Sequence, residues 1–445
     1  MKKPKTPPDV YKIWEEVRHD PERFMTIREK IPKLSAAEKY LHWDKLRYHT
    51  PPEGLSHQEW WFGLKWQRQN LFRQVPLKDK SGENFNYLLD VDPIAKRLHD
   101  IDQGAGGFIQ MPEQITNPDI RDQYYVSSLI QEAITSSQLE GAATTRKVAK
   151  EMIKSGRKPI DRSEQMILNN FITMQRIGKL KKEILSKKLV FELHRLITEK
   201  TLDDPSAAAR FRKADERIIV GDMYNEVFHD PPSAQELEDR MAEMCDFANG
   251  KSHKEFIHPV IRAIILHFWL AYDHPFVDGN GRVARALFYW SMLRNNYWLF
   301  EFISISQIIL NAPAEYSRAF LYTETDDNDL TYFVLYHLNV IHHAITELHK
   351  YIERKTCQIQ ALETQLRGVV ALNYRQRALI SHALRHPHHR YTIKSHQISH
   401  NVVYQTARYD LLHLEGLNLL KSAKIGRRWY FTPVDNLEAK LMKLG

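Results

Sequence analysis

Two apolar helical segments joined by a short glycine-rich turn are the feature that most constrains this fold. The apolar run around residues 264–270 predicts a buried helix that ends near Asp273. Residues 283–290 have apolar side chains at helical spacing and predict a second helix. The backbone N–H groups of the turn would then lie at the N-terminus of the second helix, where partial positive charge favours an anion. The sequence therefore predicts an anion site at this turn.

The composition is that of a soluble globular protein, with 43% hydrophobic and 27% charged residues among 445. No run approaches ~18 consecutive apolar residues, so no membrane-spanning helix is expected. The basic residues 1–5 lack the apolar stretch of a secretory signal. The two cysteines, Cys245 and Cys357, exclude a disulfide framework and a cysteine-type zinc site. Together these features predict a cytoplasmic protein.

Helical periodicity dominates most of the chain, so we predict a mainly α fold of three domains. The domains expected are an N-terminal helical subdomain (1–115), a helical domain that holds the turn (116–360) and a C-terminal module (367–445). A β-hairpin is predicted at 217–223, from β-branched residues followed by Gly-Asp. The acidic residues 325–329 are interpreted as a solvated helix entry rather than a calcium site. The tryptophans expected to form an aromatic core in the N-terminal subdomain are Trp43, Trp60, Trp61 and Trp66.

The net charge of +8 is concentrated in the C-terminal module. From Arg367 onward there are thirteen Lys and Arg against four Asp and Glu, a net charge of +9. The rest of the chain is therefore close to neutral, at −1. A basic module on a neutral body predicts a polyanionic partner for that module alone.

Residues 274–285 combine the groups that phosphoryl or nucleotidyl transfer requires. His274, with an ordinary pKa near ~6.5, can accept a proton at neutral pH. Asp278 can hold Mg²⁺, which binds through one or two carboxylates together with substrate phosphates. The residues expected to contact the phosphates of a nucleoside triphosphate are Gly279, Asn280, Gly281, Arg282 and Arg285.

The same twelve residues resemble the signature of Fic-domain proteins, His-Pro-Phe-x-Asp-Gly-Asn-Gly-Arg-x-x-Arg, at all nine specified positions. The resemblance implies a helical Fic fold and a nucleotidyltransferase that moves AMP from ATP, with Mg²⁺ (or Mn²⁺), to a Ser, Thr or Tyr hydroxyl of a target protein. It also implies that Arg285 pairs with the γ-phosphate. Doc-type relatives, which phosphorylate instead, resemble the pattern but carry Lys where this chain has Gly281. The resemblance therefore favours AMP transfer over kinase activity.

Residues 136–141 resemble the Fic inhibitory motif, Ser/Thr-x-x-x-Glu-Gly/Asn, with Ser136, Glu140 and Gly141 at its specified positions. The resemblance implies that Glu140 forms an ion pair with Arg285, so that ATP binds only in an unreactive pose. A desolvated pair of this kind can act as a lock, because breaking it leaves a buried charge. Two alternatives stay open: Glu140 could orient a water that removes AMP from a modified target, or the protein could transfer another phosphate-containing group.

The predicted hairpin, with Ile218, Ile219 and Val220, resembles the Fic flap. In that family the flap holds the target segment by β-strand addition, using the backbone groups of an exposed edge. Residues 209–212 correspond to the Gly-x-Phe/Tyr-Arg sequence that precedes the flap. Ala209 stands where glycine is expected, which leaves the conformation of this turn open.

Residues 371–433 predict three helices followed by a hairpin, and they resemble the winged helix at the C-terminus of many bacterial Fic proteins. Winged helices insert one helix into the major groove of DNA and contact phosphates through the wing. They also serve as protein-interaction or homodimer modules. One alternative is therefore a DNA-binding regulator whose Fic domain senses nucleotide. The residues expected to contact DNA are Gln405, Thr406, Arg408, Arg427 and Arg428.

Overall fold

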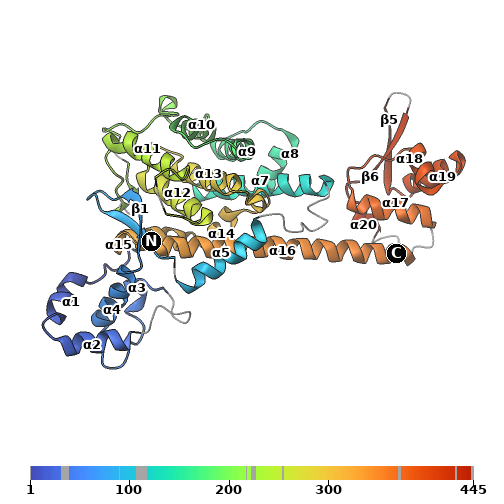
Figure 1. Ribbon diagram of the computed structural model, residues 1–445. Helices are drawn as coiled ribbons and strands as arrows, with labels where there is room; N and C mark the ends of the chain where they lie inside the picture. Colours follow the sequence, from blue (N-terminus) through green and yellow to red (C-terminus); the bar gives the residue numbers. More distant parts are fainter. Residues whose placement is uncertain are drawn as a thin grey trace. The chain divides into compact units, whose positions relative to one another are not determined.

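The computed structural model describes residues 2–31, 40–89, 91–106, 118–216, 218–221, 227–252, 255–368, 372–425 and 428–441. These residues form two compact units. One unit contains the described residues up to 106 and from 128 to 345, and the other contains 118–127 and the described residues from 346 onward. Helices predominate and the strands are few and short (Figure 1), so the predicted mainly α fold is confirmed. None of the described helices is long and apolar enough to cross a membrane.

The N-terminal part of the first unit consists of helices around an aromatic core, with one β-hairpin. Its elements are α1 (Val10–Val17), α2 (Pro21–Lys30), α3 (Trp43–Leu46), α4 (His57–Gln69), β1 (Arg73–Lys78), β2 (Asn84–Tyr87) and α5 (Asp92–Ala105). Trp61 is fully buried, and Trp14 stacks on Trp66 with ring centroids 5.3 Å apart. The predicted core therefore contains Trp60 and Trp61 with Trp43 packed against them, whereas Trp66 is exposed at its surface.

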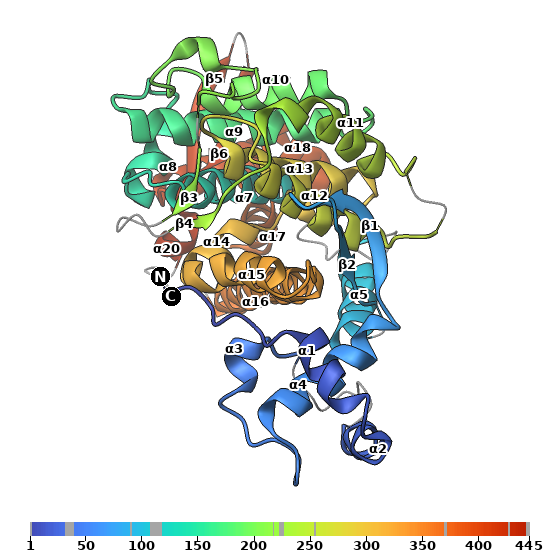
Figure 2. The ribbon, with the colours of Figure 1, turned by 90° about the vertical axis from the view of Figure 1, so that its left-hand side faces the viewer.

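The hairpin β1–β2 forms although β1 contains Pro76, which has no backbone N–H to donate to a ladder. The residues on either side of Pro76 are nevertheless buried, and Asp79 closes the turn by accepting hydrogen bonds from two backbone N–H groups. β1 lies beside α11 (Leu237–Ala248), as Figure 2 shows. The N-terminal segment thus contains one hairpin that the sequence analysis does not anticipate, beside the helices that it does.

A buried ion pair joins the N-terminal helices to the segment before α16 (Thr331–Gly368). Lys65 Nζ lies 2.7 Å from Asp326 Oδ1, and both side chains are 1% exposed. Tyr332 donates a hydrogen bond of 2.7 Å to the other oxygen of that carboxylate. The interpretation of residues 325–329 as a solvated loop is therefore wrong. The positive charge that neutralises Asp326 comes from Lys65, which lies 261 residues earlier in the chain. No local sequence pattern reveals such a distant partner.

The remainder of the first unit is helical apart from one small hairpin. Its elements are α7 (Pro118–Leu139) from residue 128 onward, α8 (Arg146–Ser155), α9 (Arg162–Leu180), α10 (Lys187–Thr198), β3 (Val220–Gly221), β4 (Val227–His229), α11, α12 (Pro259–Asp273), α13 (Asn280–Arg294), α14 (Ile305–Asn311), α15 (Pro313–Thr325) and α16 up to residue 345, with 3-10 turns at Pro205–Ala207, Ala234–Glu236 and Trp298–Glu301. The central helices α12 and α13 pack against each other, and Trp269 and Trp290 are buried there. This packing holds the turn between them in place.

The second unit contains the C-terminal helices and hairpin. Its elements from residue 372 onward are α17 (Tyr374–Arg385), α18 (Ile393–His400), α19 (Tyr404–Gly416), β5 (Leu420–Ile425), β6 (Arg428–Pro433) and α20 (Leu437–Leu441). β5 and β6 are antiparallel, and Leu411 and Phe431 belong to the apolar core of this unit. Three helices and a hairpin thus lie in the predicted order. The predicted domain limits of 1–115, 116–360 and 367–445 stay predictions.

Candidate active site

The turn between α12 and α13 is shaped by two residues in the left-handed region. His274 ends α12 at φ 45°, and Gly279 precedes α13 at φ 86°. A Cβ on Gly279 would lie 2.9 Å from Thr198 Cγ2, so both the backbone conformation and the lack of space favour glycine. The side chain of Asn280 accepts a hydrogen bond from the Phe276 N–H (2.9 Å) and donates one to the Phe276 carbonyl (2.8 Å). That amide therefore braces the turn, and backbone N–H groups at the start of α13 are left to meet an anion.

The imidazole of His274 is half-buried and neutral at pH 7. Its Nδ1 lies 3.2 Å from the Ala271 carbonyl, so a proton on Nδ1 leaves Nε2 as the acceptor nitrogen. Burial lowers the pKa of His274 to about 4. Arg212 holds the backbone of the same residue, because its Nε donates to the His274 carbonyl at 2.9 Å. His274 can thus accept a proton from a group that approaches Nε2.

The carboxylate of Asp278 is 39% exposed and faces two arginines. Oδ1 accepts a hydrogen bond from the Gly279 N–H (2.5 Å) and lies 3.4 Å from Arg282 Nη2, whereas Oδ2 lies 3.7 Å from Arg162 Nη2. No three His, Cys, Asp or Glu side chains of the described residues gather into a complete metal site. A single accessible carboxylate fits Mg²⁺ or Mn²⁺, because such an ion takes its remaining ligands from water and substrate phosphates.

Both arginines of the turn are buried. Arg282 donates from Nη1 to the Ile197 carbonyl (3.1 Å), and its Nε has no hydrogen-bond partner among the described residues. Burial lowers the pKa of Arg282. An unpartnered guanidinium N–H beside the turn suits an oxygen ligand, since a buried donor without a partner is unfavourable.

Arg285 is bonded to the end of α7. Its Nε donates to Ser136 Oγ (2.8 Å), and its Nη2 donates to the Ser136 carbonyl (2.9 Å) and to Glu140 Oε1 (2.8 Å). Burial alone would raise the pKa of Glu140, but the Arg285 guanidinium outweighs it and the pKa lies below its usual value. A Cβ on Gly281 would lie 2.1 Å from Glu140 Oε1, so only glycine leaves room for this carboxylate. Gly141 follows at φ 89°. The two predicted motifs therefore meet in space.

Two residues far away in the chain hold the turn, and no sequence motif assigns this role to either of them. His194 Nδ1 accepts a hydrogen bond from the Ala209 N–H (2.9 Å), so Nε2 carries the proton and donates to the Asp278 carbonyl (3.0 Å). Its ring stacks on Phe276 with centroids 3.8 Å apart, and burial lowers its pKa to about 4. Arg212, described above, is the second. They lie 84 and 62 residues from their partners in the chain, so only the fold brings them together.

The segment before the hairpin adopts the conformation that the expected glycine would favour. Ala209 has φ 54°, in the left-handed region that L side chains rarely occupy. Ala209 therefore keeps the turn conformation expected of glycine, at some cost in backbone strain.

The predicted flap contains a short hairpin. Ile219 and Val220 are exposed and Ile218 is half-buried. Gly221 pairs with β4 instead of forming the predicted Gly-Asp turn, so the connection comes later in the chain. Residues 222–226 lie outside the described part of the structure. The predicted residues Ile219 and Val220 thus present exposed apolar side chains at a short hairpin.

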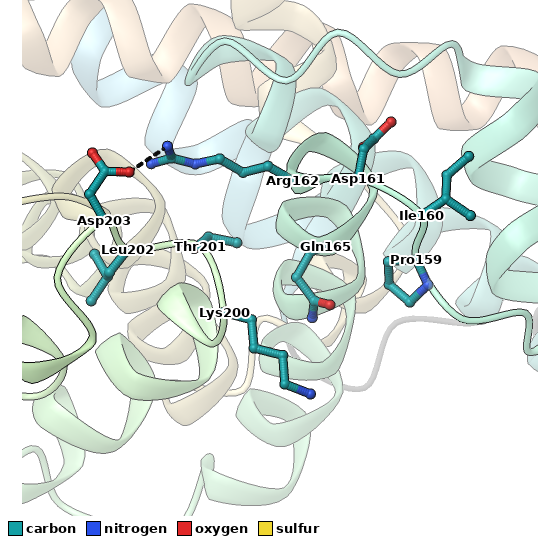
Figure 3. A pocket seen from close by; sticks show the side chains of 9 residues that line it. All are labelled: Pro159, Ile160, Asp161, Arg162, Gln165, Lys200, Thr201, Leu202 and Asp203. Atoms are coloured by element: carbon teal, nitrogen blue, oxygen red, sulfur yellow. Dashed lines mark hydrogen bonds and ion pairs between the residues drawn. The ribbon is translucent and has the colours of Figure 1, made fainter.

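A polar groove of about 270 Å³ is lined by residues 159–162, 165 and 200–203 (Figure 3). Arg162 points from it toward Asp203, with Nη1 2.9 Å from Asp203 Oδ1, and its Nη2 approaches Asp278. None of the lining residues belongs to the predicted site. The groove therefore adjoins the site through Arg162 and does not include His274.

The residues predicted to contact DNA lie in α19 and the hairpin of the second unit. Gln405 and Arg408 are exposed on α19, and Thr406 is half-buried. Arg428 is the first residue of β6, and Arg427 lies outside the described residues. Two of the predicted side chains, both on α19, are therefore accessible to a partner.

The region around the turn matches a known family. The model of the Fic/DOC family matches residues 184–292, which include α10, α11, α12, the turn and most of α13. This region is a Fic domain. The Fic domain contains His274, Asp278 and both arginines, whereas Ser136 and Glu140 precede it in the chain.

Curated relatives of this Fic domain are named as adenylyltransferases. "Protein adenylyltransferase Fic" from Nematostella vectensis is 27% identical over 179 residues, which cover 40% of this chain and 39% of that protein. The protein of the same name from Drosophila virilis is 31% identical over 157 residues, which cover 35% of this chain and 30% of that protein. The matches thus span well under half the length of these relatives.

A solved structure shares the fold beyond the Fic domain itself. A Fic family protein from Desulfovibrio desulfuricans superposes with a TM-score of 0.51 over 78% of this chain and 96% of that chain, at 18% identity. This likeness supports the Fic fold.

Proposed function

We propose that this protein transfers AMP from ATP to a Ser, Thr or Tyr hydroxyl of a target protein. The main support is that neutral His274 lies on the same turn as the backbone N–H groups that open α13 and the unpartnered Nε of Arg282. A proton acceptor beside a preorganised anion site is what the attack of a hydroxyl on a phosphate requires. The names of the curated relatives support ATP as the nucleotide and a protein as the acceptor.

In the proposed reaction the acceptor oxygen forms a bond to the α-phosphorus of ATP. The bond between that phosphorus and the oxygen bridging to the β-phosphate breaks, and pyrophosphate leaves. Nε2 of His274 takes the proton of the hydroxyl. The backbone N–H groups of residues 280–282 and the side chain of Arg282 hold phosphate oxygens, and Arg285 holds the γ-phosphate. Asp278 would hold Mg²⁺ or Mn²⁺, which when bound neutralises charge on the phosphates.

The identity of the transferred group can be tested with two labels. The Glu140→Gly variant, with heat-inactivated cell extract as the source of acceptor proteins and with Mg²⁺, is incubated with ATP labelled with ³²P at the α-position or at the γ-position. AMP transfer gives labelled protein from the α-label only, whereas a kinase gives it from the γ-label. Because this chain carries Gly281 where the phosphorylating Doc-type relatives carry Lys, the resemblance leads us to expect label from the α-position. Label from the γ-position alone would refute the proposal.

We also propose that Glu140 inhibits the enzyme. Arg285 cannot hold a γ-phosphate while its Nη2 donates to Glu140 and to the Ser136 carbonyl. ATP that binds without this arginine contact would have its α-phosphate misaligned for attack by the acceptor hydroxyl. The side chain of Glu140 is 28% exposed, so it can leave toward solvent without disrupting the core.

The target segment is proposed to dock on the hairpin of β3 and β4. Ile219 and Val220 are exposed there, and an edge strand can pair with an extended segment through its backbone groups. The acceptor hydroxyl would then be carried to His274.

The lowered pKa of His274 predicts the pH dependence of transfer. Transfer requires the neutral imidazole, which persists above its pKa of about 4. We therefore expect kcat/KM of Glu140→Gly to be nearly flat from about pH 8 to about pH 5 and to fall below that. The measurement is a pH–rate profile, with circular dichroism at each pH to check folding. An acid limb centred near the ordinary histidine pKa of ~6.5 would contradict the assignment.

The second unit is proposed to bind duplex DNA through α19 and its hairpin. The net charge of +9 from residue 367 onward and the exposure of Gln405 and Arg408 support this. Arg408→Ala should weaken binding of the full chain to a fluorescent duplex and reduce the slope of log affinity against log salt by about 1. The matched control is Arg385→Ala, an exposed arginine on α17. If wild type binds no DNA even at about 50 mM salt, the proposal fails.

A further inference from the structure

The end of α7 and helix α13 meet in antiparallel register at three positions, two of them hydrogen-bonded and one a close approach of a side chain to a glycine. Each step of four residues toward the N-terminus of α7 matches a step of four toward the C-terminus of α13, so the contacts fall on one face of each helix. The pairs are Glu140 with Gly281, Ser136 with Arg285, and Glu132 with Tyr289. The position of Glu140 is therefore set by contacts that lie one and two helical turns away from it.

The contact at Glu132 is buried and has the most hydrogen bonds of the three. The residue is 2% exposed, and its carboxylate accepts hydrogen bonds from Tyr289 Oη (2.9 Å), Ser304 Oγ (2.7 Å), the Ser306 N–H (3.1 Å) and Ser306 Oγ (2.5 Å). Ser304 is also the N-cap of α14. This cluster of four residues, the Glu132 cluster, ties α7 to both α13 and α14.

The contact at Glu140 lies at the other end of the register and is far less enclosed. α7 ends at Leu139, and Gly141 turns the chain away at φ 89°. Glu140 is 28% exposed and meets Arg285 through Oε1. The last turn of a helix opens more readily than its buried middle, because fewer contacts hold it.

We infer that Glu132 is a positioning residue that sets the register of α7, and that Arg285 is freed when the last turn of α7 opens while the Glu132 cluster stays closed. Removing the Glu132 carboxylate would take an acceptor from four donors in the interior, whereas Glu140 moves into water. The inference rests on the proposed function in one respect, that Glu140 restrains transfer by occupying Arg285.

The test begins with Glu132→Gln, which keeps the side-chain volume but removes the charge that accepts the four hydrogen bonds. We expect AMP transfer to rise about tenfold over wild type, because α7 is held in register less firmly. Backbone amides of residues 136–141 should exchange with deuterium faster than in wild type. Glu238→Gln, on the surface of α11, is the matched control and should change neither readout.

A merely structural role for Glu132 is distinguished by the double variant. If Glu132 acts through Glu140, then Glu132→Gln/Glu140→Gly should be no more active than Glu140→Gly. Gains that multiply, or unchanged transfer and exchange in a folded Glu132→Gln, would overturn the inference. A Glu140→Gly variant without increased transfer would instead refute the lock itself, so the two failures are separable.

Weaker changes cover the case in which Glu132→Gln does not fold. Tyr289→Phe and Ser306→Ala each remove hydroxyl donors while they leave the carboxylate in place. Each should raise both the transfer rate and the exchange of residues 136–141 by a smaller factor than Glu132→Gln would. Wild-type values in both folded variants would overturn the inference.

Discussion

Replacing His274 by alanine should lower the rate of AMP transfer by about 10²–10⁴-fold, because no other group then takes the proton of the attacking hydroxyl. His274 is neutral at pH 7, and Nδ1 is engaged with a backbone carbonyl, which leaves Nε2 for this task. The measurement is incorporation of α-³²P label in the Glu140→Gly background, where transfer is easiest to detect.

The backbone at this position calls for a second variant. At φ 45° alanine is strained, whereas asparagine tolerates the left-handed region and cannot act as a base. His274→Asn should therefore lose as much activity as His274→Ala while keeping more stability. His343→Ala, an exposed histidine on α16, is the matched control and should retain full activity. If either His274 variant keeps wild-type transfer with its fold intact, His274 is not the base.

Replacing Glu140 by glycine should raise transfer by about 5- to 150-fold, the range expected from breaking a coupling of this kind. The change removes the carboxylate from Arg285 and leaves the Ser136 contacts to orient the guanidinium. Arg285 can then bind the γ-phosphate of ATP. The measurement is again α-³²P incorporation, with the affinity for ATP determined by calorimetry beside it.

Two further variants test whether the gain depends on the ion pair. Glu140→Gln keeps the shape but not the charge, so it should activate less than Glu140→Gly. Arg285→Ala introduced into Glu140→Gly should abolish the gain, because the phosphate then has no partner at this position. Equal transfer in wild type and Glu140→Gly would show that Glu140 does not restrain the enzyme.

The chemistry of the turn is readable from the sequence because it is local. His274, Asp278, Gly281 and the two arginines lie within twelve residues, and glycine spacing together with the flanking apolar runs specifies a helix, a turn and a helix. The pairing of Glu140 with Arg285 follows only by resemblance, since 145 residues separate the two in the chain.

The errors in the sequence-based predictions have the same origin. Residues 325–329 read as solvated acids, but Lys65 from a distant helix neutralises Asp326 in the interior. The sequence indicates helices over residues 1–115, yet a β-hairpin forms there and its strand β1 lies beside α11. The sequence likewise gives no sign that the Asn280 side chain braces Phe276, while its role as a phosphate contact stays a prediction. Local pattern does not reveal which side chains are buried by remote parts of the chain.

By itself, the sequence determined the mainly helical fold, the reactive turn and the basic character of the C-terminal unit, because periodicity, glycine positions and charge are properties of neighbouring residues. Only the tertiary structure decided that His194 and Arg212 hold the turn, and that Glu132 sets the register of α7 on α13. Those contacts join residues scores of positions apart. Their formation depends on how helices pack, and packing is decided by the whole core rather than by any single segment.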